Sequence, residues 1–276
     1  MCELLVKKNP KFMVSLGIVL FIVAIGVIGP LVTVDPLDFV GIPFEKPSLK
    51  FILGTDSFGR DIFAQLCTGL QTSLKIGVFA SSIAILIAFI VGGLGAYKGG
   101  LVDEGANFFV NIIMVFPMLP LLLILSAFFE VRSLWLVGML IAITSWPWAA
   151  RCMRSQILSL KEREFVDLAR ISGLKDIEIV IKEVLPNLLA YVFMVFVVSI
   201  GGAVVAEAGI SMIGLGPTDV ISLGQMLYWA LLNESTRMGI WWWFIPPGLI
   251  LTVFTVSLLV MHSAMDEVFN PRLRRR

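Results

Sequence analysis

The sequence predicts an all-α integral membrane protein with six transmembrane helices, and three observations carry this prediction. Of the 276 residues, 58% are hydrophobic and only 15% are charged, whereas soluble chains hold about 45–50% apolar and about 25% charged residues. The mean hydropathy is +0.95. Six apolar stretches are long enough to cross the roughly 30 Å hydrocarbon core of a bilayer. This composition excludes a disordered tail, a nucleic-acid-binding module and an ordinary cytosolic enzyme.

The six stretches are apolar throughout, so their backbone polar groups are satisfied in lipid only if each stretch is a helix. The predicted spans cover residues 13–34, 74–97, 106–129, 134–150, 188–213 and 242–262. Basic residues predict the orientation, because they concentrate on the cytoplasmic side. With the N-terminus inside, 15 basic residues lie on the inner side and 6 on the outer side. We therefore expect a cytoplasmic N-terminus (residues 1–12) and a cytoplasmic tail (residues 263–276).

The first span follows Lys7, Lys8 and Lys11 and therefore imitates a secretory signal peptide. Its apolar run is longer than the core of a signal peptide, which holds about 7–15 residues, and no A-x-A cleavage site closes it. We expect an uncleaved membrane anchor.

The outer segment, residues 35–73, opens with three prolines within residues 36–47, which exclude a continuous helix there. Residues 54–61 then read GTDSFGRD, in which polar capping residues precede a helical apolar stripe. This pattern predicts a helix lying at the membrane interface before the second span. Arg60 and Asp61 form either a local salt bridge with a helix cap or a cargo site.

Glycine and proline mark the next three spans. Three glycines within residues 92–95, at the inner end of the second span, predict close helix packing. Pro117 and Pro120 predict a kink in the third span, and Pro147 predicts one in the fourth.

The one long inner loop, residues 151–187, holds seven basic and six acidic residues. Its pattern predicts a short helix over residues 164–171. Gly173 follows where a left-handed C-terminal cap is needed, a conformation that glycine adopts without steric cost. Asp176 predicts the cap of a second helix, and Pro186 is expected to end that helix and open the fifth span.

These two helices predict a corner that projects from the membrane, with an apolar face that has no partner within the loop. From the residues alone, the corner is either a connector packed on its own bundle or a docking element.

The fifth span carries Glu207. An ionised carboxylate at mid-membrane costs about 2.5–3.5 kcal/mol, whereas the thirteen Leu, Ile, Phe and Val residues of this span contribute about 4–8 kcal/mol. Insertion therefore tolerates Glu207, and we expect it to face protein or water. With Ser211 one turn away, it either lines a gate or pathway or makes a structural hydrogen bond.

The sixth span begins beside three consecutive tryptophans, residues 241–243, which predict interface anchors or, alternatively, cargo stacking. We expect His262 to make a hydrogen bond rather than to bind a ligand. It is the one histidine of the chain, which excludes a site that needs two imidazoles. We expect no metal site, and no disulfide among Cys2, Cys67 and Cys152.

Residues 164–173 read EFVDLARISG, and Leu185 and Pro186 follow. This stretch resembles the EAA motif of ATP-binding-cassette (ABC) importer permeases, which reads E-A-A, three residues, G, and a gap ending in L-P. Asp167 replaces the motif's Glu, Leu168 its first Ala, and Glu183 its usual Ile. The resemblance assigns ATPase coupling to Glu164, Asp167, Leu168, Ala169, Gly173, Leu185 and Pro186.

Three further stretches resemble the C-type subunit of the dipeptide/oligopeptide (Dpp/Opp) permeases. They are GTDSFGRD at residues 54–61, AEAGISMIGLG at residues 206–216 and the tail from Asp266 through NPRLR at residues 270–274. The first stretch makes Asp56, Gly59, Arg60 and Asp61 candidates for an outer-face element.

The resemblance implies a type I importer permease in a prokaryotic cell membrane, with spans two to six (residues 74–262) as its core. It also implies four kinds of partner: the lipid bilayer, a second homologous permease, two ATPase subunits, and an extracellular or periplasmic binding protein that delivers peptide. No phosphate loop of the form G-x-x-x-x-G-K-[ST] occurs. We therefore expect a non-catalytic subunit that binds no cofactor and no nucleic acid, with ATP and magnesium held by the partner ATPases.

Other functions stay open at this point. The same importer class also takes oligosaccharides or nickel. A self-sufficient secondary transporter would need more membrane carboxylates than Glu207, and an intramembrane enzyme would need His, Cys or Asp clusters that the chain lacks.

Overall fold

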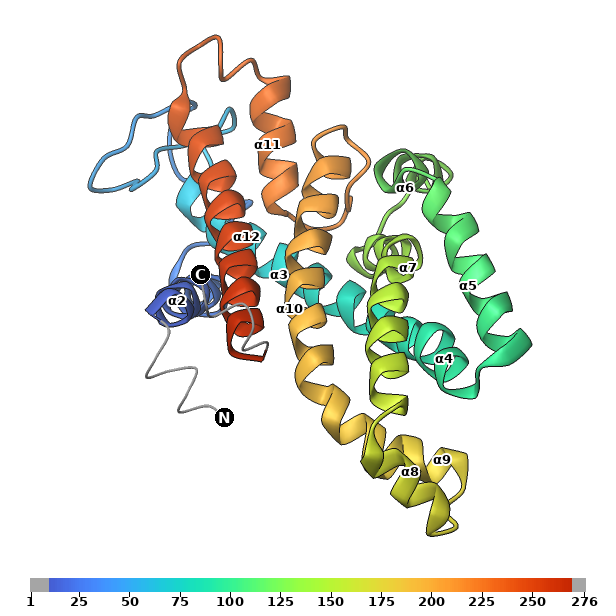
Figure 1. Ribbon diagram of the computed structural model, residues 1–276. Coiled ribbons are helices and arrows are strands. Elements are labelled where there is room, and N and C mark those ends of the chain that lie inside the picture. Colours follow the sequence, from blue (N-terminus) through green and yellow to red (C-terminus); the bar gives the residue numbers. More distant parts are fainter. Residues whose placement is uncertain (1–9, 270–276) are drawn as a thin grey trace.

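The computed structural model describes residues 10–269, with side chains described as far as residue 265. Lys7, Lys8 and the NPRLR stretch lie outside the described residues. Within the described range the regular structure is helical, apart from one isolated bridge between Thr55 and Asp61. Figure 1 shows α7, α10 and α12 as upright helices, with α8 and α9 at one end of the molecule and α11 at the other.

The helices are α2 (Pro10–Val32), α3 (Ile62–Ala88), η1 (Phe89–Leu94), α4 (Gly95–Lys98), α5 (Gly100–Val115), α6 (Met118–Ala127), α7 (Leu134–Lys161), α8 (Glu164–Ile171), α9 (Asp176–Ile179), η2 (Val180–Val184), α10 (Leu185–Ser211), α11 (Leu223–Leu232) and α12 (Trp241–Phe269). The segments η1 and η2 are π-helical. Among residues 10–269, five helical stretches are long and apolar enough to cross a membrane, and α5 with α6 makes a sixth if that bent pair is one span. The all-helical membrane fold predicted from the sequence is thereby confirmed.

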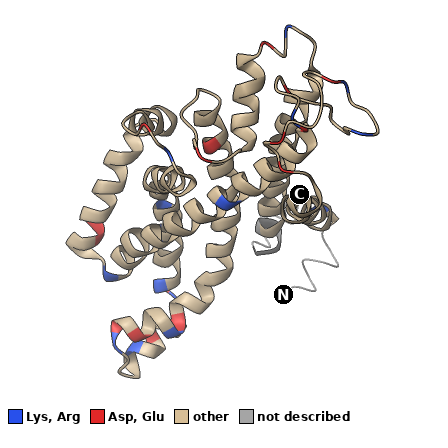
Figure 2. Cartoon of the chain, turned by 180° about the vertical axis from the view of Figure 1, so that it is seen from behind, with Lys and Arg blue, Asp and Glu red and all other residues tan. Residues whose placement is uncertain are grey.

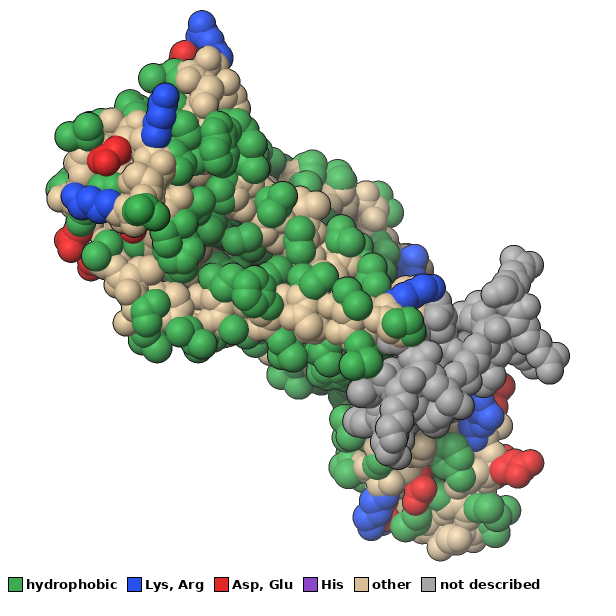
Figure 3. All heavy atoms as spheres, turned by 90° about the vertical axis from the view of Figure 1, so that its left-hand side faces the viewer, with side chains coloured by type: hydrophobic (Ala, Val, Ile, Leu, Met, Phe, Trp, Pro, Cys, Tyr) green, Lys and Arg blue, Asp and Glu red, His purple; other side chains and the backbone are tan. Residues whose placement is uncertain are grey.

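The surface divides as a membrane protein's surface should. Charged side chains gather on the segment around α8 and α9 and on the connections at the opposite end (Figure 2). Between them lies a broad hydrophobic band (Figure 3). Such a band fits the hydrocarbon region of a bilayer, where exposed charges are costly.

The second span is longer than predicted and includes the segment expected to be a separate interfacial helix. Helix α3 begins at Ile62, where the Asp61 carboxylate accepts a hydrogen bond of 2.9 Å from the Phe63 N–H. With η1 and α4 it continues to residue 98, because no proline or glycine cap interrupts it before Gly99. The predicted close packing occurs at Gly92, where an added Cβ would lie 2.3 Å from the Ala150 carbonyl oxygen.

The third span is broken rather than kinked. Helices α5 and α6 meet at an angle of 79°. Phe116 has an extended backbone (ψ 129°) because Pro117 follows it and disfavours the helical conformation there. Pro120 lies in the first turn of α6, where its missing N–H needs no partner.

The fifth span begins at Asp176, and the prediction that Pro186 ends a helix is wrong. Helices α9, η2 and α10 form one stretch of 36 residues. Proline removes the hydrogen bond to the carbonyl four residues earlier, and the π-helical turn directly before Pro186 supplies a different local hydrogen-bond pattern. The expected cap at Asp176 is also displaced, because Lys175 precedes the helix and its N–H donates to Glu178 Oε2 at 3.1 Å.

Helix α11 lies in residues 214–241, for which no prediction is made from the sequence, and the tryptophans beside it differ in part from theirs. Ser222 caps α11 by accepting a hydrogen bond from the Gln225 N–H at 3.1 Å. Trp242 and Trp243 are buried, and only Trp241 is exposed. The anchor interpretation therefore suits Trp241 alone, because its two neighbours pack in the core with α2, α3 and α11.

The orientation leads to the first testable prediction. A cysteine introduced at exposed Lys175, in a chain whose native cysteines are replaced by serine, should react with a membrane-impermeant reagent only when the inner face is accessible. The reason is the excess of basic residues on that side. Labelling in intact cells from outside would reverse the proposed topology.

Candidate functional site

The loop helix α8 has the predicted bounds, Glu164–Ile171, and it ends in a Schellman cap. The Leu174 N–H donates to the Ala169 carbonyl at 3.2 Å, and the Gly173 N–H donates to the Arg170 carbonyl at 3.0 Å. This pattern places Gly173 in the left-handed region, with φ at +80°. No heavy atom of the described chain lies within 4 Å of a Cβ built there. A side chain at this position would therefore clash with no neighbouring element, and its cost would come from the strained backbone conformation alone.

We call residues 164–181 the corner. One side of the corner packs against the helix bundle. There Val166, Ala169 and Ile179 are buried in one hydrophobic cluster with residues of α4 and α7, such as Tyr97 and Met153. The sequence left two alternatives, a connector packed on its own bundle and a docking element. The corner does pack on its own bundle, and it still presents another surface on which a partner could dock.

The surface of the corner that faces away from the bundle carries four exposed aliphatic side chains, which we call the corner patch. These are Leu168, Ile171, Ile177 and Ile181. Large exposed apolar groups gathered on a charged, solvated segment mark an interaction surface. The ion pairs beside them, Arg170 with Asp167 at 3.4 Å and Lys182 with Glu178 at 3.6 Å, are exposed. Such surface pairs contribute about 0–1 kcal/mol each, so they do not hold the corner.

The remaining residues assigned to coupling lie around the patch. Glu164 is exposed at the first turn of α8. Leu185 and Pro186 open α10 after the π-helical turn, the first half-buried and the second exposed. Helix α8 and the start of α10 lie at the same end of the molecule (Figure 1).

The outer-face residues form a separate cluster built around Asp56, which is 3% exposed. Its Oδ1 accepts hydrogen bonds from the Phe58 N–H at 2.8 Å and the Arg60 N–H at 2.9 Å. Its Oδ2 accepts one from Gln65 Nε2 at 2.8 Å. Gly59 is required in this turn, because its φ is +76° and an added Cβ would lie 2.2 Å from the Gly41 carbonyl oxygen. The motif thus closes the loop onto α3.

Arg60 and Asp61 do not form the expected salt bridge, since no ion pair joins them among the described residues. Asp61 caps α3, and burial raises the pKa of its carboxyl against the lowering effect of hydrogen bonds from backbone N–H groups. The Arg60 guanidinium instead lies against two aromatic rings, 4.7 Å from the centroid of Phe58 and 5.2 Å from that of Phe39.

Glu207 is fully buried and joins three helical segments. Its Oε1 accepts hydrogen bonds of 2.6 Å from the hydroxyls of Ser211 and Ser222, and its Oε2 accepts one of 3.0 Å from Ser73. The Ser73 hydroxyl also accepts the Leu223 N–H at 3.2 Å. Of the two alternatives, this geometry favours the structural hydrogen bond over a pathway lining.

Sequence reasoning placed Ser211 beside Glu207 but missed its other partners, Ser73 and Ser222, and a second connection made by Arg132. The guanidinium of Arg132 donates to the carbonyls of Phe129 at 2.6 Å, Gly214 at 3.1 Å and Gly216 at 3.0 Å. It thereby ties the α6–α7 connection to the segment after α10. One signal for the contact between α11 and α10 was available in the sequence, namely the glycine at position 224. The two helices approach closely there, since an added Cβ on Gly224 would lie 2.6 Å from Ala208 Cα.

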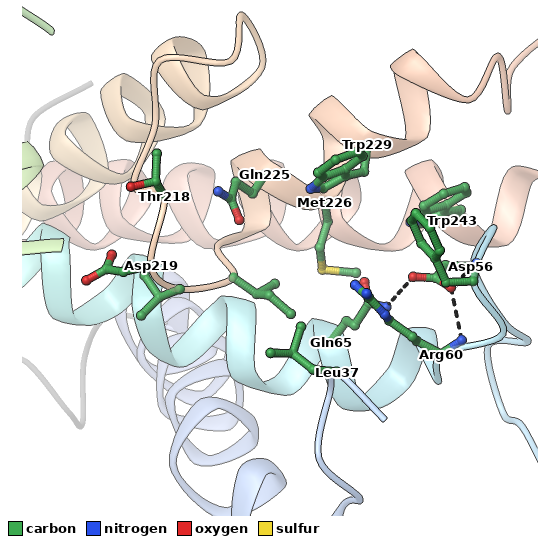
Figure 4. A pocket seen from close by; sticks show the side chains of 13 residues that line it. Leu37, Asp56, Arg60, Gln65, Thr218, Asp219, Gln225, Met226, Trp229 and Trp243 are labelled. Carbon is green, nitrogen blue, oxygen red and sulfur yellow. Dashed lines mark hydrogen bonds between the residues drawn. The ribbon is translucent and has the colours of Figure 1, made fainter. Parts of the chain in front are cut away.

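An outer pocket of about 240 Å³ lies between these elements (Figure 4). Its wall is formed by the outer loop with Asp56 and Arg60, by Gln65 of α3, by residues 218–221 and by α11 with Met226 and Trp229. The pocket therefore combines the half-buried cation of Arg60, the carboxylates of Asp56 and Asp219, other polar groups and an apolar side. The structure places the corner at the opposite end of the molecule.

Comparisons with known proteins agree with one another. Residues 78–275 match the family described as binding-protein-dependent transport system inner membrane component. The dipeptide transport system permease protein DppC of Bacillus subtilis is 31% identical over 274 residues, covering 98% of this chain and 84% of that protein. A putative peptide transport system permease protein of Brucella abortus is 28% identical over 272 residues, covering 97% and 90%. A chain of the inward-facing MetNI methionine ABC transporter has the same fold, with a TM-score of 0.58 at 18% identity over 74% of this chain and 95% of that chain.

Proposed function

Because the chain belongs to the family of binding-protein-dependent transport system inner membrane components, we propose that it carries di- or oligopeptides as the permease subunit of an ABC importer. The family and the fold make it a multi-pass membrane permease of that importer class. Peptide as cargo is supported by the relatives that span nearly the whole chain, whose names describe dipeptide and peptide transport.

In this proposal the corner transmits the work of ATP hydrolysis. The observation that supports this proposal is that the side of the corner facing the bundle is buried while the corner patch is exposed. A segment built this way can receive a partner on one side and move the attached helices on the other. An ATPase subunit with an apolar groove fits the patch, and the mixed charges around it favour a polar rim.

The assembly that follows contains this chain, a second homologous permease, two ATPase subunits and a binding protein. This chain forms half of the translocation pathway between the two permeases. The termini lie in the cytoplasm, and the binding protein meets the outer loops.

The test is reconstitution in vesicles. Uptake of a radiolabelled dipeptide is expected only when both permeases, the ATPases, the binding protein and ATP are all present. Uptake driven by an ion gradient in vesicles that hold this chain alone would instead support a secondary transporter.

A second prediction concerns catalysis. The purified chain, free of ATPase subunits, is expected to hydrolyse no ATP above background, because it has no phosphate loop. Phosphate release measured with and without added ATPase subunits tests this. Turnover by the single chain would contradict the assignment of catalysis to the partners.

A further inference from the structure

The outer pocket is somewhat smaller than typical ligand pockets, which measure about 300–1,000 Å³. Its volume of about 240 Å³ equals roughly eight water molecules at about 30 Å³ each. It lies away from the corner, and its lining residues Ile221 and Gln225 adjoin Ser222, a partner of Glu207. Nothing in the proposed coupling mechanism uses it. Figure 4 shows its side chains converging from the outer loop, α3, α11 and residues 218–219.

Arg60 is the residue that gives this pocket its chemistry. It is half-buried, and its Nε is buried without a hydrogen-bond partner. Within the described side chains, residues 10–265, no carboxylate pairs with its guanidinium. Asp56 also lines the pocket but makes no ion pair with this guanidinium, since its oxygens accept from two backbone N–H groups and from Gln65.

The guanidinium has defined neighbours in the absence of a ligand. The Arg60 backbone is held by Asp56, and the rings of Phe58 and Phe39 flank the cationic group. Preorganisation of this kind lowers the entropic cost of binding. A guanidinium fork presents its donors in the geometry that a carboxylate accepts in two parallel hydrogen bonds.

The opposite wall supplies the rest of the recognition. Met226 and Trp229 offer apolar surface for a short side chain. Asp219 is exposed at the rim of the pocket, and its negative charge is opposite to that of Arg60. The pocket thus suits a small molecule with one carboxylate and some apolar surface.

We propose that the outer pocket binds the C-terminal carboxylate of a small peptide through Arg60. The site would hold cargo at the outer face of this subunit after its release by the binding protein. This inference rests on the proposed peptide import and adds a cargo contact within this chain.

The experiment is a calorimetric titration of the purified permease–ATPase complex without its binding protein. The probes are dialanine and its C-terminal amide, which share the ammonium group and the side chains. Wild type is expected to bind the free acid at least tenfold more tightly than the amide, and Arg60→Gln should bind both equally. Arg60→Lys should keep part of the preference, because it retains the charge but loses the fork.

Two further variants make the outcome decisive. Arg237→Gln changes an exposed arginine outside the pocket that pairs with Glu234, and it should keep the full acid-to-amide ratio. Asp219→Lys adds a cation at the exposed rim without touching buried groups, and it should raise that ratio severalfold even if Arg60→Gln fails to fold. Equal binding of acid and amide by wild type, an unchanged ratio in a folded Arg60→Gln complex, or an unchanged ratio in Asp219→Lys would overturn the proposal. Dipeptide uptake by the complete importer is measured separately, so the proposed function can stand while this site fails.

Discussion

Gly173→Val is expected to reduce transport at least tenfold while the permease stays at close to wild-type abundance in the membrane. Gly173 has a φ of +80°, and a β-branched residue held there costs about 1–3 kcal/mol. Since about 1.4 kcal/mol shifts an equilibrium tenfold, this strain is enough to move α8 out of its docked orientation. The spans should still insert, because the loop lies outside the hydrocarbon.

Two controls separate this effect from general damage. Gly173→Asn should retain more transport, because asparagine tolerates the left-handed region better. Gly239→Val introduces the same residue at a similar φ of +71°, also with nothing within 4 Å of the new Cβ, but in the connection between α11 and α12. It should leave ATPase co-purification intact. The measurements are uptake, abundance and ATPase co-purification, and normal uptake by Gly173→Val would show that the corner does not work in this way.

Glu207→Leu is expected to lower the abundance and the thermal stability of the permease, and to abolish transport as a consequence. The substitution leaves the buried hydroxyls of Ser73, Ser211 and Ser222 without their acceptor. Each unsatisfied group costs about 1–3 kcal/mol, and the sum is comparable to the total stability of a domain, about 5–15 kcal/mol. The connection of α10 to α3 and α11 should fail first.

Glu207→Gln is the matched control, because it keeps the shape and one acceptor oxygen and should retain intermediate stability. Thermal unfolding of the purified complex, followed alongside membrane abundance, distinguishes the two interpretations of Glu207. If Glu207→Leu folds as stably as wild type yet transports nothing, the carboxylate serves a gate or pathway and the structural assignment is wrong.

Features governed by local chemistry could be read from the sequence. The bounds of α8 and the left-handed Gly173 depend on neighbours within a few residues, and both predictions are confirmed. The number of apolar stretches long enough to span likewise follows from composition along the chain. The Asp61 cap is another local feature that the pattern located, although the ion pair expected beside it is absent.

Features governed by distant contacts could not be read in this way. The joining of the predicted interfacial helix and the second span into one helix, α3, depends on packing of its first turns in one cluster with α2, α10, α11 and α12, which periodicity does not reveal. The buried fate of Trp242 and Trp243 follows from the packing of α12 on other helices. Ser73 and Ser222 lie 134 and 15 positions from Glu207, so nothing in their local sequence marks them as its partners.

The most direct test of coupling through the corner is site-specific photocross-linking in the assembled importer. A benzophenone amino acid at Leu168, which is 63% exposed in the corner patch, should cross-link to an ATPase subunit. The same group at Leu49, a fully exposed position in the outer loop, should not. An ATPase adduct from Leu168 alone is the result that our account predicts. No adduct from Leu168, in a complex that still transports, would contradict it.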